Sequence, residues 1–307
     1  MVFKSSVPND NAIRHIFEIL STPVLKLIIG AILISFSGVW VKIADVSPDS
    51  SAFYRVFFGF LFLLIIAGRA REKILTDKPQ FLLGVVCGVL FAADLICWHR
   101  SIILIGPGLA TILGNFQVFV LAAVGIFFLK ERYSKILLLS IPLAVTGLFL
   151  IVGFGWTDMT GGYRLGINLG LATAFFYSAY ILTLKKFSAR CSGTFLPMLL
   201  VSFSTAVVLG IYILSIGDTF AIPDLRSLLS LVGLGFFSQC LGWLLIATSL
   251  PHTNTSGAGL ILLLQPALAF CWDVLIFSRP TDPLNWFGVF ITLFAIYLGL
   301  SSRREQL

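Results

Sequence analysis

Long runs of apolar residues are the feature that most limits what this chain can fold into. Of its 307 residues, 58% are hydrophobic and 11% are charged, whereas a soluble domain carries roughly 25% charged residues. About 20 apolar residues are enough for a helix to cross the hydrocarbon core of a bilayer. In lipid a chain must satisfy its backbone hydrogen bonds internally, which favours helices over irregular segments. The sequence therefore predicts an all-α integral membrane protein.

Ten apolar runs can be placed along the chain, with short polar segments between them. Their ranges are 25–44, 51–68, 81–101, 108–129, 135–153, 165–184, 194–215, 226–247, 256–277 and 284–302. Residues 1–24 are expected to form a cytoplasmic N-terminal segment, in which residues 11–20 have the pattern of a short interfacial helix. The sequence thus predicts ten transmembrane helices.

The positive residues are distributed unequally between the two sides of the predicted bundle. Of the 21 Lys and Arg residues, fifteen fall on the side of the N-terminus and six on the other. The six are Lys42, Arg55, Arg100, Arg164, Arg226 and Arg279. Positive residues favour cytoplasmic loops, so both termini are expected in the cytoplasm of an inner or plasma membrane. The formal net charge of +7 is interpreted in the same way, and nucleic acid is not expected as a partner.

The chain also shows an internal duplication. At a fixed offset of 148 residues, Gln117 aligns with Gln265 and Ala110 with Ala258, and the hydropathy of the two halves matches better than their identity. This divides the chain into five-helix repeats at residues 25–155 and 165–302. Because five is an odd number, the second repeat must enter the membrane with the opposite orientation. Two inverted repeats are therefore expected.

Several local patterns resemble the EamA-type families of the drug/metabolite transporter superfamily. Residues 37–42 (SGVWVK) resemble the end of that family's first span, and residues 54–58 (YRVFF) resemble the start of its second. Residues 108–132, from Gly-Leu-Ala-Thr through Gln117 to Lys-Glu-Arg, resemble its fourth span and closing turn, and Gln265-Pro266 resembles its ninth span. The second half departs from the closing turn, because residues 278–280 are Ser-Arg-Pro. The resemblance implies ten helices around a central substrate cavity, with no bound cofactor.

Ionisable residues inside the spans are candidate functional groups, because a charge at the centre of a membrane helix is costly. Asp94 and Asp273 have short side chains that cannot extend to the membrane surface, so each needs a partner or a proton. With His99 they are candidates for coupling transport to protons. Lys42, Arg55 and Arg100 lie at similar depth, where a long side chain can instead reach the interface.

Other polar and aromatic residues form stripes that suit the wall of a substrate cavity. The candidate substrate-binding residues are Gln117, Gln265, Trp40, Lys42, Trp98 and Trp243. The alternative is helix packing, since small residues and amides also mediate helix contacts in lipid. The pairs Gly84/Gly88 and Gly166/Gly170 are interpreted as packing sites.

These features favour a secondary transporter over an enzyme, because no P-loop, H-E-x-x-H or G-x-S-x-G motif occurs in the sequence. We expect alternating-access transport, and export rather than import, of a small zwitterionic or cationic amphipathic metabolite such as an amino acid. The expected partners are this substrate, membrane lipids and protons, with the chain acting as a monomer or a homodimer. One alternative is an importer or exchanger of a nucleoside-like metabolite such as S-adenosylmethionine. Another is an intramembrane enzyme that uses Asp94, His99 and Asp273 on a lipid-like substrate.

Overall fold

The regular structure of the chain is helical throughout the part that the structure describes. The structure is a computed structural model that describes residues 22–72, 77–131, 134–152, 161–278 and 280–301. Eight helical segments there are long and apolar enough to cross a membrane, and two shorter apolar helices lie at Lys135–Ile151 and Pro283–Gly299. The ten predicted helices are therefore present. The interfacial helix expected at residues 11–20 lies outside the described residues.

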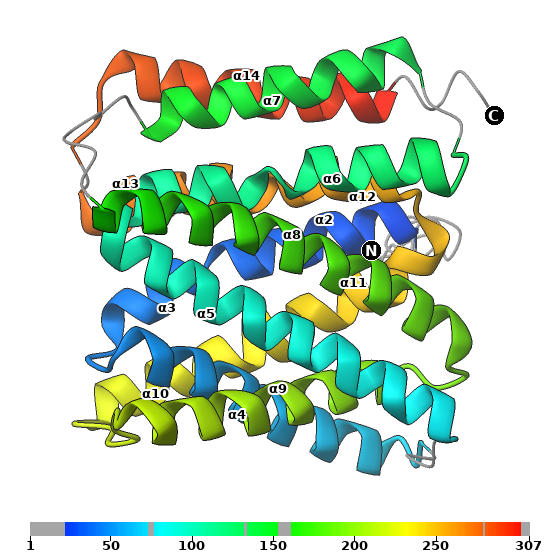
Figure 1. Ribbon diagram of the computed structural model, residues 1–307, viewed down its shortest axis with the longest axis vertical. Coiled ribbons are helices and arrows are strands. Elements are labelled where there is room, and N and C mark those ends of the chain that lie inside the picture. Colours follow the sequence, from blue (N-terminus) through cyan, green and yellow to red (C-terminus); the bar gives the residue numbers. More distant parts are fainter. Residues whose placement is uncertain (1–21, 73–76, 132–133, 153–160, 279, 302–307) are drawn as a thin grey trace, which may run out of the picture.

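Each half of the chain contributes a set of helices, which Figure 1 labels and colours along the sequence. The first half comprises α2 (Pro23–Ser35), α3 (Ser37–Ile43), α4 (Pro48–Arg69), α5 (Lys78–Asn115), α6 (Gln117–Ala123), the π-helical η1 (Val124–Phe128) and α7 (Lys135–Val152). The second half comprises α8 (Gly161–Arg190), α9 (Leu196–Ile216), α10 (Leu225–Gly233), the π-helical η2 (Leu234–Gly242), α11 (Trp243–Ser249), the short 3-10 helix η3 (Leu250–His252), α12 (Thr255–Leu262), α13 (Leu264–Phe277) and α14 (Pro283–Ser301).

Local sequence explains where several helices begin. Ser47 accepts a hydrogen bond from the backbone N–H of Ser50 at 3.1 Å, and Pro48 follows it as the first residue of α4. Asp77 and Asp224 cap α5 and α10 in the same way. A side-chain oxygen at this position satisfies one of the backbone donors that a helix start leaves free. These caps place the helix starts close to the edges of the apolar runs.

The contacts between helices follow the twofold relation of the two halves. The pairs α4 with α9, α6 with α12 and α7 with α14 each join corresponding spans of the two halves. The third span, in α5, packs on the sixth, α8. The corresponding spans in the other halves are the eighth, formed by η2 and α11, and the first, which contains α2, and these also pack together. Backbone turns repeat as well: Arg71 and Gly217 both have positive φ, as do Lys130 and Ser278. The closing turn after the ninth span therefore keeps the backbone form of the one after the fourth, although its residues differ.

Spans four and nine are interrupted at equivalent places. The first breaks at Phe116, between α5 and α6, and the second breaks at Leu263, between α12 and α13. The offset is 147 residues; Gln117 is the first residue after its break and Gln265 is the second after its own. Discontinuous helices near the middle of a membrane are a common way to place polar groups at a transport site.

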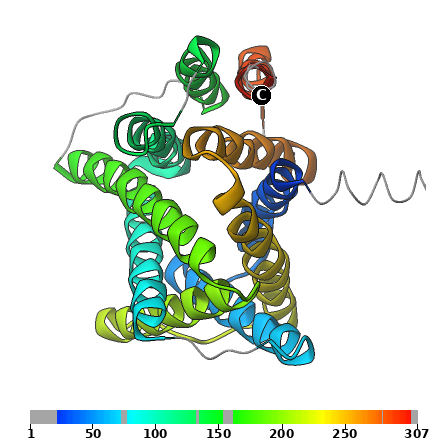
Figure 2. The same ribbon diagram turned by 90° about the vertical axis from the view of Figure 1, so that its right-hand side faces the viewer.

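Helices α7 and α14 pack on each other at one edge of the molecule (Figure 2) and contact α12 and α13 on their inner side. Their backbones approach closely at Gly147 and Gly288, because a Cβ on Gly147 would lie 2.7 Å from the carbonyl oxygen of Gly288. The predicted glycine pairs pack similarly: a Cβ on Gly84 would lie 3.0 Å from Leu200, and one on Gly166 would lie 2.8 Å from Leu104.

Replacing Gly147 by alanine is expected to destabilise the pair of α7 and α14. Overpacking of this kind lowers the free energy of unfolding by about 1–3 kcal/mol. Thermal unfolding of the purified protein in detergent measures the effect. Gly68 is the matched control, because no atom lies within 4 Å of the Cβ that alanine would add there. Equal midpoints for Gly147→Ala and Gly68→Ala would contradict the close approach.

Candidate functional site

Two opposite charges of the first half, Arg55 and Asp94, lie near each other inside the bundle. Arg55 comes from α4, and Asp94, whose exposed fraction is 6%, comes from α5 one turn after Phe91. The two charges lie within electrostatic range of each other. The guanidinium of Arg55 also lies 5.9 Å from the ring centroid of Phe91. A buried charge is costly, and the nearby opposite charge of Arg55 reduces this cost for Asp94.

Aromatic side chains from the second half close around this pair. The ring of Tyr180 stacks on Phe91 with 4.5 Å between centroids, and Trp243 contacts Tyr180 edge-on at 4.9 Å. Tyr177 lies 6.1 Å from Trp243 between ring centroids, and the side chain of Gln265 lies near its hydroxyl. Edge-on and stacked rings at these separations pack favourably. Five helices, α4, α5, α8, α11 and α13, thus meet at one place.

We call this group the central cluster. It consists of Arg55, Phe91, Asp94, Tyr177, Tyr180, Trp243 and Gln265. Several of its polar atoms are buried without a hydrogen-bond partner among the described residues: Arg55 Nε, Tyr180 Oη, Trp243 Nε1 and Gln265 Nε2. A buried polar atom without a partner is unfavourable by about 1–3 kcal/mol. Such a concentration of open donors and acceptors is typical of a place where water or a ligand binds.

Gln117 lies against the same part of α8 as Gln265 does. Its exposed fraction is 1%, and neither atom of its amide has a partner among the described residues. Its backbone carbonyl accepts a hydrogen bond from the Ser178 hydroxyl at 3.3 Å. Ser178 follows Tyr177 directly in α8. The two glutamines that the duplication relates therefore flank the same stretch of one helix.

The other predicted carboxylate, Asp273, has a different partner and position. Asp273 lies in the last part of α13 and forms an ion pair with Lys42, which lies near the end of α3. The ammonium group of Lys42 also lies 4.8 Å from the centroid of the Phe277 ring. The side chain of Lys42 is 52% exposed and that of Asp273 is 20% exposed. The pair thus joins the first and second halves near one end of the bundle, away from the central cluster.

The remaining predicted residues are distributed around these two places. His99 is 6% exposed, lies within electrostatic range of Arg55, and has an unpartnered Nδ1. Trp98 stands beside it, and a Cβ on Gly114 would lie 3.8 Å from the Trp98 ring. Trp40 stacks on Phe237 at 5.9 Å and is not part of the central cluster.

The sequence alone did not single out Phe91, Tyr177 and Tyr180. With 29 Phe and 7 Tyr in the chain, an aromatic residue carries little information by itself. The usable signal was the run of polar and aromatic residues at 177–180 (YSAY) in the middle of an otherwise apolar span. A further signal appears only in three dimensions, because η2, just before Trp243, is π-helical, a form often found at functional sites.

Comparison with known proteins identifies the family. The model of the EamA-like transporter family matches residues 21–153 and again residues 164–301. The chain belongs to the EamA-like transporter family. It is 23% identical over 279 residues to the uncharacterized transporter YdfC of Bacillus subtilis (strain 168), which covers 90% of this chain and 86% of that protein. A crystal structure that is 16% identical shares the fold, with a TM-score of 0.79 over 93% of this chain and 99% of the other.

As an EamA-family protein the chain is a multi-pass membrane transporter and not an enzyme. The transporter prediction is thus confirmed, and the intramembrane enzyme is set aside. The two matches to one family model agree with a duplicated architecture, and membership implies a small molecule as substrate.

Proposed function

We propose that this transporter moves a small zwitterionic metabolite, such as an amino acid, out of the cell across the inner or plasma membrane by alternating access. The observation that carries the proposal is the presence of two nearby opposite charges, Arg55 and Asp94, inside the central cluster. The guanidinium of Arg55 suits the carboxylate of a zwitterion, because arginine binds carboxylates with several parallel donors. The carboxylate of Asp94 and the faces of the neighbouring rings suit its ammonium group.

The open hydrogen-bonding atoms of the cluster support the same assignment. A bound substrate would supply partners to Gln265 Nε2, Tyr180 Oη and Trp243 Nε1, which have none among the described residues. We propose Gln117, Trp98 and His99 as neighbouring contacts. In this proposal Lys42 and Trp40 act nearer one membrane surface, and the ion pair of Lys42 with Asp273 fixes helix positions there.

The proposal also assigns coupling and orientation. Asp94 is the acidic residue of the central cluster, and we propose that it holds either the substrate ammonium group or the exchanged proton. Asp94 cannot hold the ammonium group and the proton at the same time, so movement of the substrate is coupled to movement of protons. We further propose that both termini are cytoplasmic, from the uneven distribution of Lys and Arg. This orientation places the loop that contains Glu131 in the cytoplasm.

Purified protein in liposomes tests the proposal with a panel of amino acids and related zwitterions. The expected result is accumulation of an unmodified substrate driven by a pH gradient, and exchange of labelled for unlabelled substrate without a gradient. Asp94→Asn is expected to abolish the gradient-driven accumulation. It should leave exchange measurable at raised substrate concentration, because exchange needs no net proton movement. Absence of flux for every zwitterion, or unchanged gradient-driven transport in Asp94→Asn, would contradict the proposal.

A further inference from the structure

A second group of charged residues lies at the end of the bundle where α12 begins. Glu131 follows the fourth span and accepts hydrogen bonds from the backbone N–H of Thr255 at 2.7 Å and of Ser256 at 3.3 Å. It therefore caps the first turn of α12, where a negative charge is favourable. Burial by itself raises the pKa of Glu131, but the bonds from Thr255 and Ser256 and the charge of Lys185 outweigh it and lower the pKa. Its carboxylate is ionised at neutral pH.

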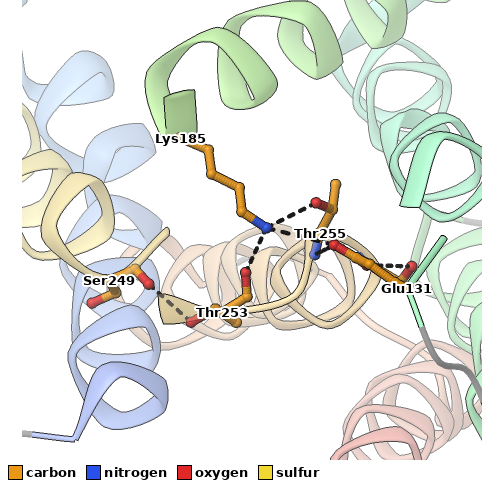
Figure 3. Close-up of polar contacts among 6 residues, drawn as sticks. Glu131, Lys185, Ser249, Thr253 and Thr255 are labelled. Atoms are coloured by element: carbon orange, nitrogen blue, oxygen red, sulfur yellow. Dashed lines mark hydrogen bonds and ion pairs between the residues drawn. The ribbon is translucent and has the colours of Figure 1, made fainter. Parts of the chain in front are cut away.

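Lys185 connects a third helix to the same place (Figure 3). Its ammonium group lies 3.5 Å from Glu131 Oε1, and it donates to the carbonyl oxygen of Thr253 at 2.7 Å and to the hydroxyl of Thr255 at 3.0 Å. We call Glu131, Lys185, Thr253, Thr255 and Ser256 the Glu131 cluster. It joins the fourth span, which belongs to the first half of the chain, to α8 and the start of α12, which belong to the second half.

The helices of the Glu131 cluster are in close contact. A Cβ on Gly125 would lie 2.6 Å from Glu131 Oε2 and 2.7 Å from the hydroxyl of Ser256. Side-chain exposure of Lys185 and Glu131 is 22% and 14%. Ser178, which is 1% exposed beside Gln117, lies seven residues before Lys185 on the same face of α8. The Glu131 cluster thus lies between the central region and one end of the bundle.

Another carboxylate contact between the halves is repeated at both ends of the bundle. Glu72 accepts backbone N–H bonds of 3.0 Å from Phe195 and Leu196 at the start of α9. Asp218, 146 residues after Glu72, accepts the hydroxyl of Ser47 at the start of α4. Carboxylates thus join α4 and α9 at both ends of the bundle, through backbone N–H groups at one end and through a hydroxyl at the other.

The Glu131 contact has no counterpart of this kind among the residues that the structure describes. Lys130 and Ser278 form equivalent turns with a φ of 52°. The residue after the first turn is Glu131, whereas the residue after the second is Arg279. Arginine has no acceptor for backbone N–H groups, so the sequence does not repeat the carboxylate at position 279. The connection through Glu131 is thus specific to one end.

We propose that the Glu131 cluster is a gate that closes one side of the transporter, the cytoplasmic side in the proposed orientation, and that it must break for the central cluster to open to that side. At the opposite end the halves are joined by a different contact, the ion pair of Lys42 with Asp273. The inference rests on the proposed alternating access. Its test needs no substrate, so it can fail while transport in liposomes is still observed.

Accessibility of a reporter cysteine tests the gate in the full-length protein. The five native cysteines are replaced, Ser178→Cys is introduced, and its reaction with a small membrane-impermeant thiol reagent is followed in vesicles of each orientation. Glu131→Gln is expected to raise the reaction rate about tenfold from the face that carries Glu131, and from that face only. Lys185→Gln is expected to act in the same direction. Glu72→Gln is the control, because its contact does not belong to the gate.

Three results would overturn the gate. The first is a rate from the Glu131 face that changes by less than about twofold in both variants, which is below the coupling expected between such sites. The second is an equal rise from both faces, or an equal rise in Glu72→Gln, which would indicate general loosening. The third is failure of Glu131→Gln and Lys185→Gln alike to give folded protein, which would make the cluster a permanent structural contact. If one variant does not fold, the other decides.

Discussion

Arg55→Gln is expected to be among the most damaging single substitutions in this transporter. It removes the positive charge that partners Asp94, whose exposed fraction is 6%, and leaves the carboxylate buried among aromatic rings. A buried carboxylate that loses its nearby positive charge lowers the free energy of unfolding by about 1–3 kcal/mol, and by more when it stays ionised. Thermal unfolding in detergent and substrate exchange in liposomes measure the two consequences, stability and transport. Both are expected to fall strongly.

The double variant Arg55→Gln/Asp94→Asn separates these two consequences. With both charges removed, most of the lost stability is expected to return, but exchange of the zwitterion is not. Arg100→Gln is the matched control, because Arg100 donates to the Tyr212 hydroxyl at 2.6 Å in an exposed position. Equal stability of Arg55→Gln and Arg100→Gln would show that Arg55 is not a buried partner of Asp94.

Trp243→Ala is expected to have the largest effect on packing. The indole ring is 1% exposed and contacts Phe91 at 5.4 Å and Tyr180 at 4.9 Å between centroids. Removing it leaves a cavity where five helices meet, and comparable substitutions lower the free energy of unfolding by about 3–5 kcal/mol. The midpoint of thermal unfolding measures the loss. Trp243→Phe, which retains a ring, is expected to lose less.

Trp286 provides the control for this substitution. Its side chain is 42% exposed at the edge of the molecule, so Trp286→Ala removes few buried contacts. The expected order of stability is Trp286→Ala, then Trp243→Phe, then Trp243→Ala. A Trp243→Ala variant as stable as Trp286→Ala would mean that the central cluster does not hold the helices together.

The sequence predicted most of the fold because the membrane limits the choices. Apolar runs that can cross a bilayer have to be helices, and five of them in each half impose inversion. The equivalence of Gln117 and Gln265 was also visible, and the structure places both in the first two residues after helix breaks. The breaks themselves were not predicted, because neither Phe116 nor Leu263 is a residue that ordinarily interrupts a helix.

The sequence predicted less of the candidate site, for a physical reason. It identified Asp94, Asp273, Lys42 and Arg55 as costly charges but gave no way to pair them. The partner of Lys42 is Asp273, 231 residues away, whereas Asp94 lies within reach of Arg55. Such pairings depend on which helices touch, and apolar spans of similar composition do not reveal that.

The most direct test of the account asks whether the charges of the central cluster recognise the two charges of the substrate. Inhibition of exchange by an N-acetyl derivative, which lacks the ammonium charge, and by a methyl ester, which lacks the carboxylate, is compared in wild type and Asp94→Asn. Wild type is expected to bind both derivatives about tenfold or more weakly than the parent zwitterion, since each leaves a buried group unpaired. Asp94→Asn should tolerate the N-acetyl derivative while still rejecting the ester. If Asp94→Asn rejects the N-acetyl derivative as strongly as wild type does, Asp94 does not bind the ammonium group and the central claim is wrong.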